Sequence, residues 1–448
     1  MLFNSLDFAV FLPIVFALYW FVTNHNLKLQ KALIVAASYV FYGWWDWRFL
    51  SLIIFSTLVD YSIGRRLKNE EKQSTRKILL WTSIIVNLGF LGFFKYYNFF
   101  LDNFVAAFSF FGQEIQSNTL NIILPVGISF YTFQTLSYTI DVYKKNLEPT
   151  EDFIAFSAFV CFFPQLVAGP IERATNLLPQ FYKKRFLTYS KEASWLIITG
   201  LLRKMVFADN FGYFVDIVWS SAINSNIFTF ILSSLFFTIQ IWFDFSGYSR
   251  IARGVALLFG FRLMLNFNYP YQAKSLKEFW SRWHISLSTW FKDYLYIPLG
   301  GSKRGPLWTL LNLFIVFLVS GVWHGAGWNF ILWGALHGIF IVIERFFKIH
   351  LGKTITILVV ILAWIPFRAP DLTTMLIYGQ GIAQMPNHIG DLHAGIGPIF
   401  LGFNIILFLL LFVYLNLEKR MSDWIYFIAP IALFFLSYSS KTFIYFQF

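Results

Sequence analysis

Three histidines are the residues whose surroundings in this chain most favour chemistry. His284 lies in a segment of mixed aromatic and charged residues, His324 at the junction of two apolar runs, and His337 within the second of those runs. An ionisable side chain at membrane depth is a functional candidate, because its charged form is costly there. Neutral imidazole accepts a proton from a hydroxyl near neutral pH, so a general base is the simplest chemistry available. The alternatives are an interfacial anchor at the end of a span and a hydrogen-bonding group between helices.

Other kinds of site find less support in the sequence. The remaining histidines, His25, His350, His388 and His393, fall in expected loops, and Cys161 is the only cysteine. There is no H-E-x-x-H motif, and no carboxylate or cysteine stands beside the histidines of the apolar runs, so we expect no metal site. The G-x-S-x-G and G-x-x-x-x-G-K motifs are also absent, which argues against a serine hydrolase and a nucleotide-hydrolysing pump.

The composition indicates what kind of molecule must position these histidines. Of 448 residues, 57% are hydrophobic and only 13% are charged, whereas about 25% of the residues of soluble domains are charged. With a mean hydropathy of +0.60, we expect an all-α polytopic membrane protein, with residues 1–448 forming one integral-membrane domain and no separate soluble domain. The net charge of +12 is attributed to basic cytoplasmic loops and not to a nucleic-acid partner.

Apolar runs and the charges between them predict the topology. The loop from Arg65 to Lys77 is crowded with basic residues, whereas residues 96–119 carry none. Because Lys and Arg collect on the cytoplasmic side, this alternation predicts that the N-terminus lies outside and that His324 lies toward the outer half of the membrane. The runs predicted to lie in the membrane are Leu6–Val22, Ala32–Trp45, Phe49–Gly64, Ile78–Phe94, Leu120–Ile140, Ile227–Phe243, Leu307–Trp323, Trp328–Ile343, Ile355–Pro366, Ile399–Leu415 and Trp424–Leu436.

The apolar segment Phe153 to Ala168 departs from this alternation, because basic groups flank it on both sides. Pro164 interrupts it, and Gly169-Pro170 closes it. Proline breaks a helix and restricts the residue before it, so the segment predicts a re-entrant element and not a continuous span. Broken backbone at membrane depth is tolerated only inside protein or beside water. We therefore expect a polar cavity here.

The segment Ser275 to Tyr296 mixes charged residues with tryptophans. Trp280, His284, Leu287 and Phe291 recur at steps of four, three and four, and charged residues occupy the neighbouring face. This spacing predicts an amphipathic helix, which would lie on the cytoplasmic surface of the membrane.

Several long motifs resemble those of the membrane-bound O-acyltransferase family, and specifically its bacterial alginate O-acetyltransferase branch. The resemblance covers nearly the whole chain, and the motifs follow one another in the order of that branch. They are Met1–Ser5, Phe163–Ile171, Ser281–Tyr294, Tyr294–Gly301, Trp323-His324-Gly325-Ala326, and Trp333-Gly334 with His337-Gly338.

The resemblance implies a helical bundle, with re-entrant and amphipathic helices around a transmembrane tunnel. It implies that acetyl-coenzyme A is the donor and enters from the cytoplasm, with no metal involved. His324, in the Trp-His-Gly motif, is implied as the catalytic base and His284 as its supporting residue, while His337 has an accessory part. Arg282 and Lys292 are candidates for binding the phosphates of the donor, within a wider basic set that also includes Lys277, Lys303 and Arg304.

The same resemblance implies where the enzyme works and with what. It would be a multi-pass protein among the lipids of the bacterial cytoplasmic (inner) membrane, and the acyl group would emerge outside. The acceptor would be an extracytoplasmic polysaccharide, either an alginate-like exopolysaccharide or a cell-wall glycan, reached through an SGNH-type transferase partner. Two other functions stay open: a transporter or flippase for a lipid-linked sugar, which would also need broken helices and buried polar groups, and a non-catalytic membrane scaffold.

Overall fold

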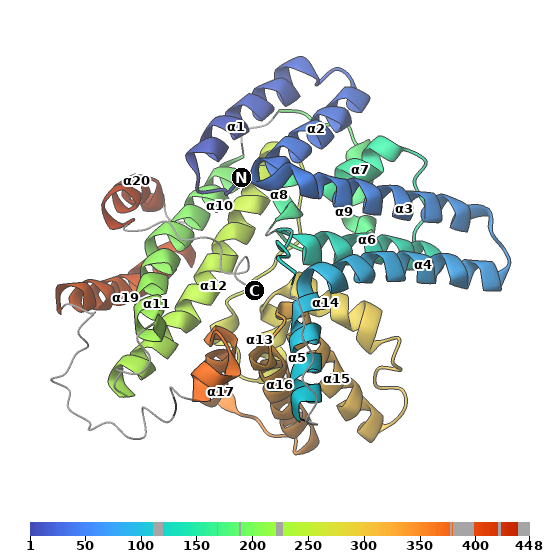
Figure 1. The fold of residues 1–448 in the computed structure, drawn as a ribbon. Helices are drawn as coiled ribbons and strands as arrows, with labels where there is room; N and C mark the ends of the chain where they lie inside the picture. The colour runs from blue at the N-terminus through green and yellow to red at the C-terminus, as the bar shows by residue number, and fades with distance from the viewer. Residues whose placement is uncertain are drawn as a thin grey trace. The chain divides into compact units, whose positions relative to one another are not determined.

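The structure is a computed structural model that describes residues 1–110, 120–167, 169–187, 190–220, 227–376, 379, 398–419 and 423–437. Throughout these ranges the regular elements are helices, without β-strands, so the expected all-α fold is confirmed (Figure 1). Within them, five helices are long and apolar enough to cross a membrane, which agrees with a polytopic protein. These are Gln73–Phe110, Thr229–Leu258, Pro306–His324, Trp328–Phe346 and Leu401–Glu418.

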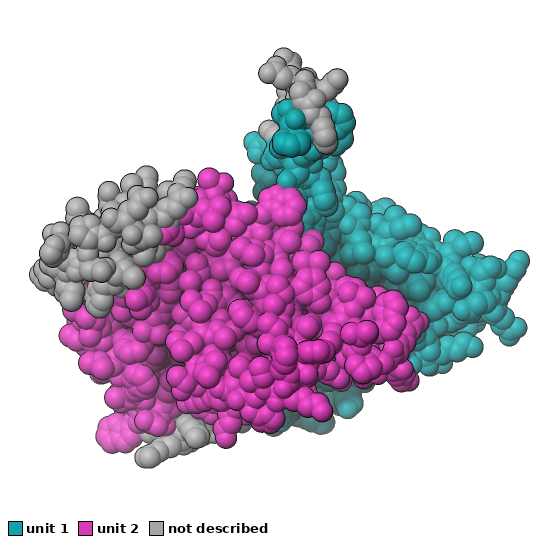
Figure 2. Space-filling view, turned by 90° about the horizontal axis from the view of Figure 1, so that it is seen from below, with its two compact units in different colours: residues 1–190, 255–264 teal, residues 191–254, 265–448 magenta. Residues whose placement is uncertain are grey.

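The chain forms two compact units, which Figure 2 shows in different colours. Unit 1 comprises Met1–Ser190 and Val255–Met264, and unit 2 comprises Lys191–Gly254 and Leu265–Phe448. All three candidate histidines belong to unit 2. The expectation of a single integral-membrane domain over residues 1–448 stays a prediction.

Unit 1 is a group of helices, three of which share a buried polar network. Asp60 on α3 is fully buried and accepts hydrogen bonds from Ser83 Oγ (2.5 Å) and Asn87 Nδ2 (2.9 Å) on α4 and from Thr139 Oγ1 (2.9 Å) on α6. Because a buried carboxylate is tolerated only when it is bonded in this way, the network fixes how the three helices pack. The helices are α1 (Leu6–Ala17) with its π-helical continuation η1 (Leu18–Val22), α2 (Leu27–Asp46), α3 (Leu50–Asn69), α4 (Gln73–Leu91), α5 (Tyr97–Phe110), α6 (Ile128–Tyr143), α7 (Phe153–Cys161), α8 (Phe163–Leu166), α9 (Ala174–Leu177) and the 3₁₀ helix η4 (Leu178–Tyr182).

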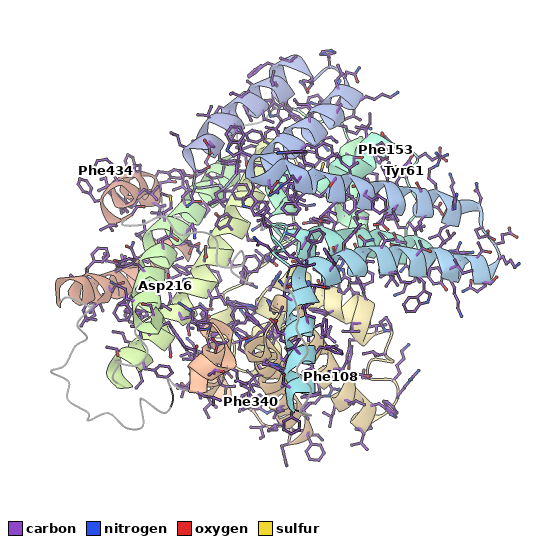
Figure 3. All side chains as sticks on the ribbon, in the orientation of Figure 1. Tyr61, Phe108, Phe153, Asp216, Phe340 and Phe434 are labelled. Atoms are coloured by element: carbon purple, nitrogen blue, oxygen red, sulfur yellow. The ribbon has the colours of Figure 1, made fainter. Side chains whose placement is uncertain are left out.

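The interrupted segment predicted around Pro164 is a pair of short helices, α7 and α8. Phe162, between them, leaves the helical conformation at φ −50° and ψ 104°. Pro164 follows in the first turn of α8, where its missing N–H group costs nothing. At the start of α7, Phe153 packs on Tyr61 of α3 with ring centroids 5.1 Å apart (Figure 3). The break is confirmed; Ala168 lies outside the described residues, and the re-entrant path through a membrane stays a prediction.

Unit 2 is built around two long antiparallel helices, α15 (Pro306–His324) and α16 (Trp328–Phe346). A Cβ on Gly321 would lie 2.4 Å from Phe330 O, and one on Gly334 would lie 2.5 Å from Phe317 O. Only glycine permits so close an approach of two backbones. The other helices are α10 (Lys191–Leu201), η5 (Leu202–Ala208), α11 (Asp209–Ser220), α12 (Ile227–Leu258, whose last residues belong to unit 1), α13 (Leu276–Arg282), α14 (Ile285–Phe291), η8 (Lys292–Tyr296), α17 (Gly352–Arg368), α19 (Pro398–Lys419) and α20 (Trp424–Leu436).

The predicted continuous amphipathic helix over Ser275 to Tyr296 is wrong. It consists of α13, α14 and the π-helical η8, and the chain bends between α13 and α14. Trp283 is extended (φ −103°, ψ 129°) and His284 adopts the left-handed conformation (φ 42°, ψ 53°). The helical spacing of the apolar residues continues across this bend, so periodicity alone could not reveal it.

Several other boundaries differ from those predicted. Helix α6 begins at Ile128 and not at Leu120, because Pro125 and the left-handed Gly127 (φ 77°) precede it. Helix α12 continues to Leu258, fifteen residues beyond the predicted end at Phe243. Helices α10 and α11 were not predicted, because their charged residues conceal an otherwise apolar pattern.

Candidate active site

The three candidate histidines come from three different places in unit 2, and all are buried. His284 lies between α13 and α14 and is 1% exposed, His324 ends α15 and is 5% exposed, and His337 lies in α16 and is 0% exposed.

Two tryptophans connect the histidines. The Trp323 ring centroid lies 6.2 Å from that of His284 and 4.9 Å from that of His324. The Trp333 ring centroid lies 4.9 Å from that of His324 and 5.0 Å from that of His337. These are ordinary packing distances between aromatic rings. The structure therefore brings His284, His324 and His337 into one contiguous group, here named the histidine cluster.

His324 owes its position to the turn between α15 and α16. Gly325 leaves the helical conformation directly after it (φ −163°, ψ 157°), so the imidazole occupies the last position of α15. Phe367 of α17 packs on the ring at 5.2 Å between centroids. His324 thus lies at a helix end but remains enclosed by aromatic side chains.

His284 is oriented by a residue that the sequence did not point to. Its Nδ1 lies 3.1 Å from Asn266 Oδ1, which also accepts hydrogen bonds from the backbone N–H (3.2 Å) and the hydroxyl (2.8 Å) of Ser286. The backbone N–H is always a donor, so it identifies this Asn266 atom as the oxygen. His284 must then donate from Nδ1–H, and Nε2 carries the basic lone pair. Burial lowers the pKa of His284 to about 3, so the ring is neutral at physiological pH.

His337 lies deepest in the cluster. Its ring centroid is 4.9 Å from that of Trp280 and 6.2 Å from those of Phe317 and Trp364. Within the described part of the chain, neither ring nitrogen of His337 has a hydrogen-bond partner, and neither do the indole nitrogens of Trp280 and Trp364. Buried polar groups in proteins are usually bonded, and exceptions occur at functional sites.

A cavity of about 440 Å³ lies against the cluster. Trp280 and Phe317, which pack on His337, are also lining residues of this cavity. Three cations, Lys277, Lys292 and Arg345, and one carboxylate, Glu344, line it together with apolar side chains from α14 and α15. We name it the donor cavity, since it combines an apolar wall beside the histidines with positive charge.

The structure separates the two cations that the sequence singled out. Lys292 lines the donor cavity, whereas Arg282 is not among its lining residues. Arg282 instead pairs with Glu278 one helical turn earlier, at 2.8 Å, and donates to the carbonyl of Asn268 at 3.3 Å. Lys277, from the wider basic set, also lines the cavity, and Lys303 and Arg304 do not. Within the described residues no group of three or more His, Cys, Asp or Glu side chains could hold a metal ion.

Sequence reasoning missed Asn266, Trp364, Phe367 and Arg345 as parts of this site. Asn266 is 18 residues from His284, and Trp364 and Phe367 are still farther along the chain from the histidines that they contact, so no local spacing could reveal them. Arg345 lines the cavity, and no signal in the sequence distinguishes it from other basic residues. The remaining histidines do not belong to this site as far as the structure describes them: His25 and His350 are exposed, and His388 and His393 lie outside the described residues.

Comparisons with known proteins identify the family of the chain. Residues 150–377 match the model of the MBOAT, membrane-bound O-acyltransferase, family. A probable alginate O-acetylase of Azotobacter vinelandii is 41% identical over 384 residues, which cover 83% of this chain and 76% of the relative. The peptidoglycan O-acetyltransferase of Helicobacter pylori is 37% identical over 427 residues, covering 86% and 80%.

A more distant relative extends the comparison. The teichoic acid D-alanyltransferase of Bacillus subtilis is 29% identical over 243 residues, which cover 51% of this chain and 60% of the relative. The matched family region contains the whole histidine cluster and the donor cavity. The chain is therefore an O-acyltransferase of the membrane-bound O-acyltransferase family, in the bacterial branch that includes the alginate O-acetylases.

Proposed function

We propose that the protein transfers acetyl groups from cytoplasmic acetyl-coenzyme A across the membrane for O-acetylation of an extracytoplasmic polysaccharide. One observation carries this proposal: Trp280 and Phe317 line the donor cavity, which also holds three cations, and both pack on His337 of the histidine cluster. A thioester whose phosphates contact Lys277, Lys292 and Arg345 would direct its acyl end toward these rings.

In the proposed reaction His324 is the general base. It accepts the proton of an acceptor hydroxyl while the hydroxyl oxygen attacks the thioester carbonyl carbon. The bond between that carbon and the sulfur breaks, and the departing thiolate takes the proton that His324 had accepted. His284, neutral and oriented by Asn266, supports this step through Trp323, and His337 has an accessory part. Enclosure by aromatic rings excludes water, which would otherwise hydrolyse the thioester.

The acceptor and the partner are also proposals. The alginate O-acetylase and the peptidoglycan O-acetyltransferase are both named for O-acetylation of a glycan polymer, which supports a polysaccharide acceptor. A bulky polymer would be modified outside the membrane, through an SGNH-type transferase partner.

The reaction is tested in liposomes that contain the purified chain and enclose radiolabelled acetyl-coenzyme A. Release of coenzyme A is followed with and without an external acceptor. We expect His324→Ala to lower turnover by about 10²- to 10⁴-fold, the usual size of general-base catalysis. His350→Ala, which removes an exposed imidazole from the same unit, should turn over like the wild type. Undiminished turnover in His324→Ala would contradict the catalytic role.

The proposed location is the bacterial inner membrane, with the N-terminus outside. Cysteine labelling tests the orientation, because Cys161 is buried and contributes little background. Ser74→Cys and Ser109→Cys place a thiol at two exposed positions on opposite predicted sides. A membrane-impermeant reagent should label the cysteine at position 109 from outside and the one at position 74 only after permeabilisation. Equal labelling of both from outside would overturn the predicted topology.

A further inference from the structure

Unit 1 contains a second basic cavity that the acyl-transfer reaction does not use. Its volume is about 520 Å³, and it shares no lining residue with the donor cavity. Four of its described lining residues are cations, and none is a carboxylate. The cations are Lys183, Lys184, Arg185 and Arg262, and the amides of Asn176 and Gln180 lie among them.

Hydrogen bonds between two segments of the chain fix the walls of this cavity. The Gln180 side chain accepts from the backbone N–H of Arg262 and donates to its carbonyl, both at 2.9 Å. The carboxylate of Glu172 is fully buried and accepts from Asn176 Nδ2 (2.7 Å) and from the backbone N–H of Met264 (2.5 Å). The segment after α12 is thereby joined to η4 and α9, so the cations of the two segments stand around one preformed hollow.

Arg185 is the unusual member of the group. Only 7% of it is exposed, and its guanidinium donates to Tyr19 Oη (3.1 Å) and to the Gln180 carbonyl and stacks on Phe261 at 3.7 Å. None of these partners carries negative charge. Burial lowers the pKa of Arg185, in keeping with these neutral surroundings. A buried cation normally has an anion beside it.

The backbone beside Arg185 leaves room for this arrangement. Gly260 has a φ of 78°, and a Cβ there would lie 2.6 Å from Arg185 Cδ. Only glycine combines this conformation with so close an approach. The positive-inside tendency explains exposed lysines in a cytoplasmic loop. It does not explain a buried arginine that lines a cavity.

We propose that this cavity binds a phosphate group. Its negative charge neutralises that of Arg185, and Lys183, Lys184 and Arg262 contact it. Arginine and lysine are the side chains that recognise phosphate, through charge-assisted hydrogen bonds. Two sources supply such a group, the headgroup of an anionic phospholipid and a soluble phosphate. Phe186 and Leu187, which follow Arg185, are 69% and 47% exposed. Apolar residues beside basic ones are typical of a membrane surface and favour the lipid.

The test compares wild type with Lys183→Gln/Arg262→Gln, which removes two exposed cations of the cavity and leaves buried Arg185 in place. Lys72→Gln/Lys77→Gln is the matched control, because it removes two exposed lysines at the start of α4, elsewhere in unit 1. Dissociation constants are measured on the purified full chain in a neutral detergent. The probes are short-chain phosphatidylglycerol, short-chain phosphatidylcholine and inorganic phosphate, and gel filtration checks that each variant is folded.

We expect phosphatidylglycerol to bind the wild type at least about tenfold more tightly than phosphatidylcholine, since only the former adds a net negative charge. The cavity variant should lose about tenfold in affinity while the control keeps it. The same pattern with inorganic phosphate, without preference between the two lipids, supports the site with a soluble ligand. The proposal is overturned if neither phosphatidylglycerol nor inorganic phosphate binds the wild type. It is also overturned if the cavity variant binds as the wild type does, or if the control loses as much affinity as the cavity variant.

Discussion

Two sets of buried polar side chains in unit 2, here named the ionic group and the histidine cluster, are accommodated in different ways. In the first, Glu418 of α19 pairs with Arg203 of η5 at 2.7 Å and with Arg250 of α12 at 2.5 Å. Next to it along η5, Lys204 pairs with Asp209 at 2.8 Å and with Asp244 at 2.9 Å. Every charge of this ionic group has an opposite charge in contact, as stable burial requires.

The histidine cluster is surrounded by aromatic rings and is not built from paired charges. Its imidazoles are packed by tryptophan and phenylalanine rings, and the described part of the chain offers the nitrogens of His337 no hydrogen-bond partner. Buried polar groups that are fully bonded stabilise a fold, whereas incompletely bonded ones keep a capacity to bind or to accept a proton. The difference supports a structural role for the ionic group and the catalytic role that we propose for the histidine cluster.

The largest effect expected from this comparison is on stability. Glu418→Gln leaves two arginines without their anion, one of them deeply buried, and should lower the free energy of unfolding by about 3–5 kcal/mol. Denaturant unfolding in detergent measures it. Asp423→Asn, which breaks an exposed pair with Lys191, should have little effect. If Glu418→Gln were as stable as wild type but inactive, the ionic group would act in the reaction and not in stabilising the fold.

A pH dependence of stability is the next effect. The pKa of His284 is about 3 in the folded chain against an ordinary 6.5, so between these values the unfolded chain binds a proton that the folded chain does not. The free energy of unfolding is therefore largest above pH 6.5 and falls as the pH is lowered toward 3, by up to about 1.4 kcal/mol per unit. His284→Gln should reduce this slope, and His350→Gln should keep it. An unchanged slope in His284→Gln would mean that the cluster is not the apolar site described.

Charge introduced beside His284 should change activity. Asn266→Asp keeps an acceptor oxygen but adds an anion, which raises the pKa of His284 and stabilises the imidazolium. Turnover should then fall about tenfold between pH 8 and pH 6, where the wild type, whose ring stays neutral, loses less. Asn268→Asp, at an exposed position two residues away, serves as the control. If both variants have the wild-type profile, His284 has no part in positioning the reaction.

The smallest effect is on the KM for the thioester, and it distinguishes Lys292 from Arg282. Lys292→Gln should raise the KM for the thioester by up to about fivefold, the size of one exposed charge contact. Arg282→Gln should leave this KM unchanged, because Arg282 pairs with Glu278 outside the donor cavity. Initial rates at varied donor concentration measure both. A larger KM effect of Arg282→Gln would place the phosphates elsewhere than in this cavity.

Much of the fold was predictable because it depends on local properties. Apolar runs of about 20 residues predict helices in a membrane, and α15, α16 and α20 begin and end within a few residues of the predicted bounds. The bend at His284 was not predictable, since the spacing of Trp280, His284 and Leu287 is that of an unbroken helix. Hydrogen bonds to Asn266 from the backbone N–H groups of Ile285 and Ser286 and from His284 hold the bent conformation, and Asn266 belongs to a segment distant in sequence.

By itself, the sequence determined the helical class, the apolar character and the three histidines with chemical potential, because residue type and spacing of three or four positions carry that information. Only the tertiary structure decided that Trp323 and Trp333 join these histidines and that Lys292 and not Arg282 lines the donor cavity. It also decided that Arg185 is buried against Tyr19, Gln180 and Phe261, which are uncharged. The physical reason is that burial and pairing depend on side chains brought together from distant segments. Close packing at glycines such as Gly321 and Gly334 places those segments, and neither composition nor periodicity expresses it.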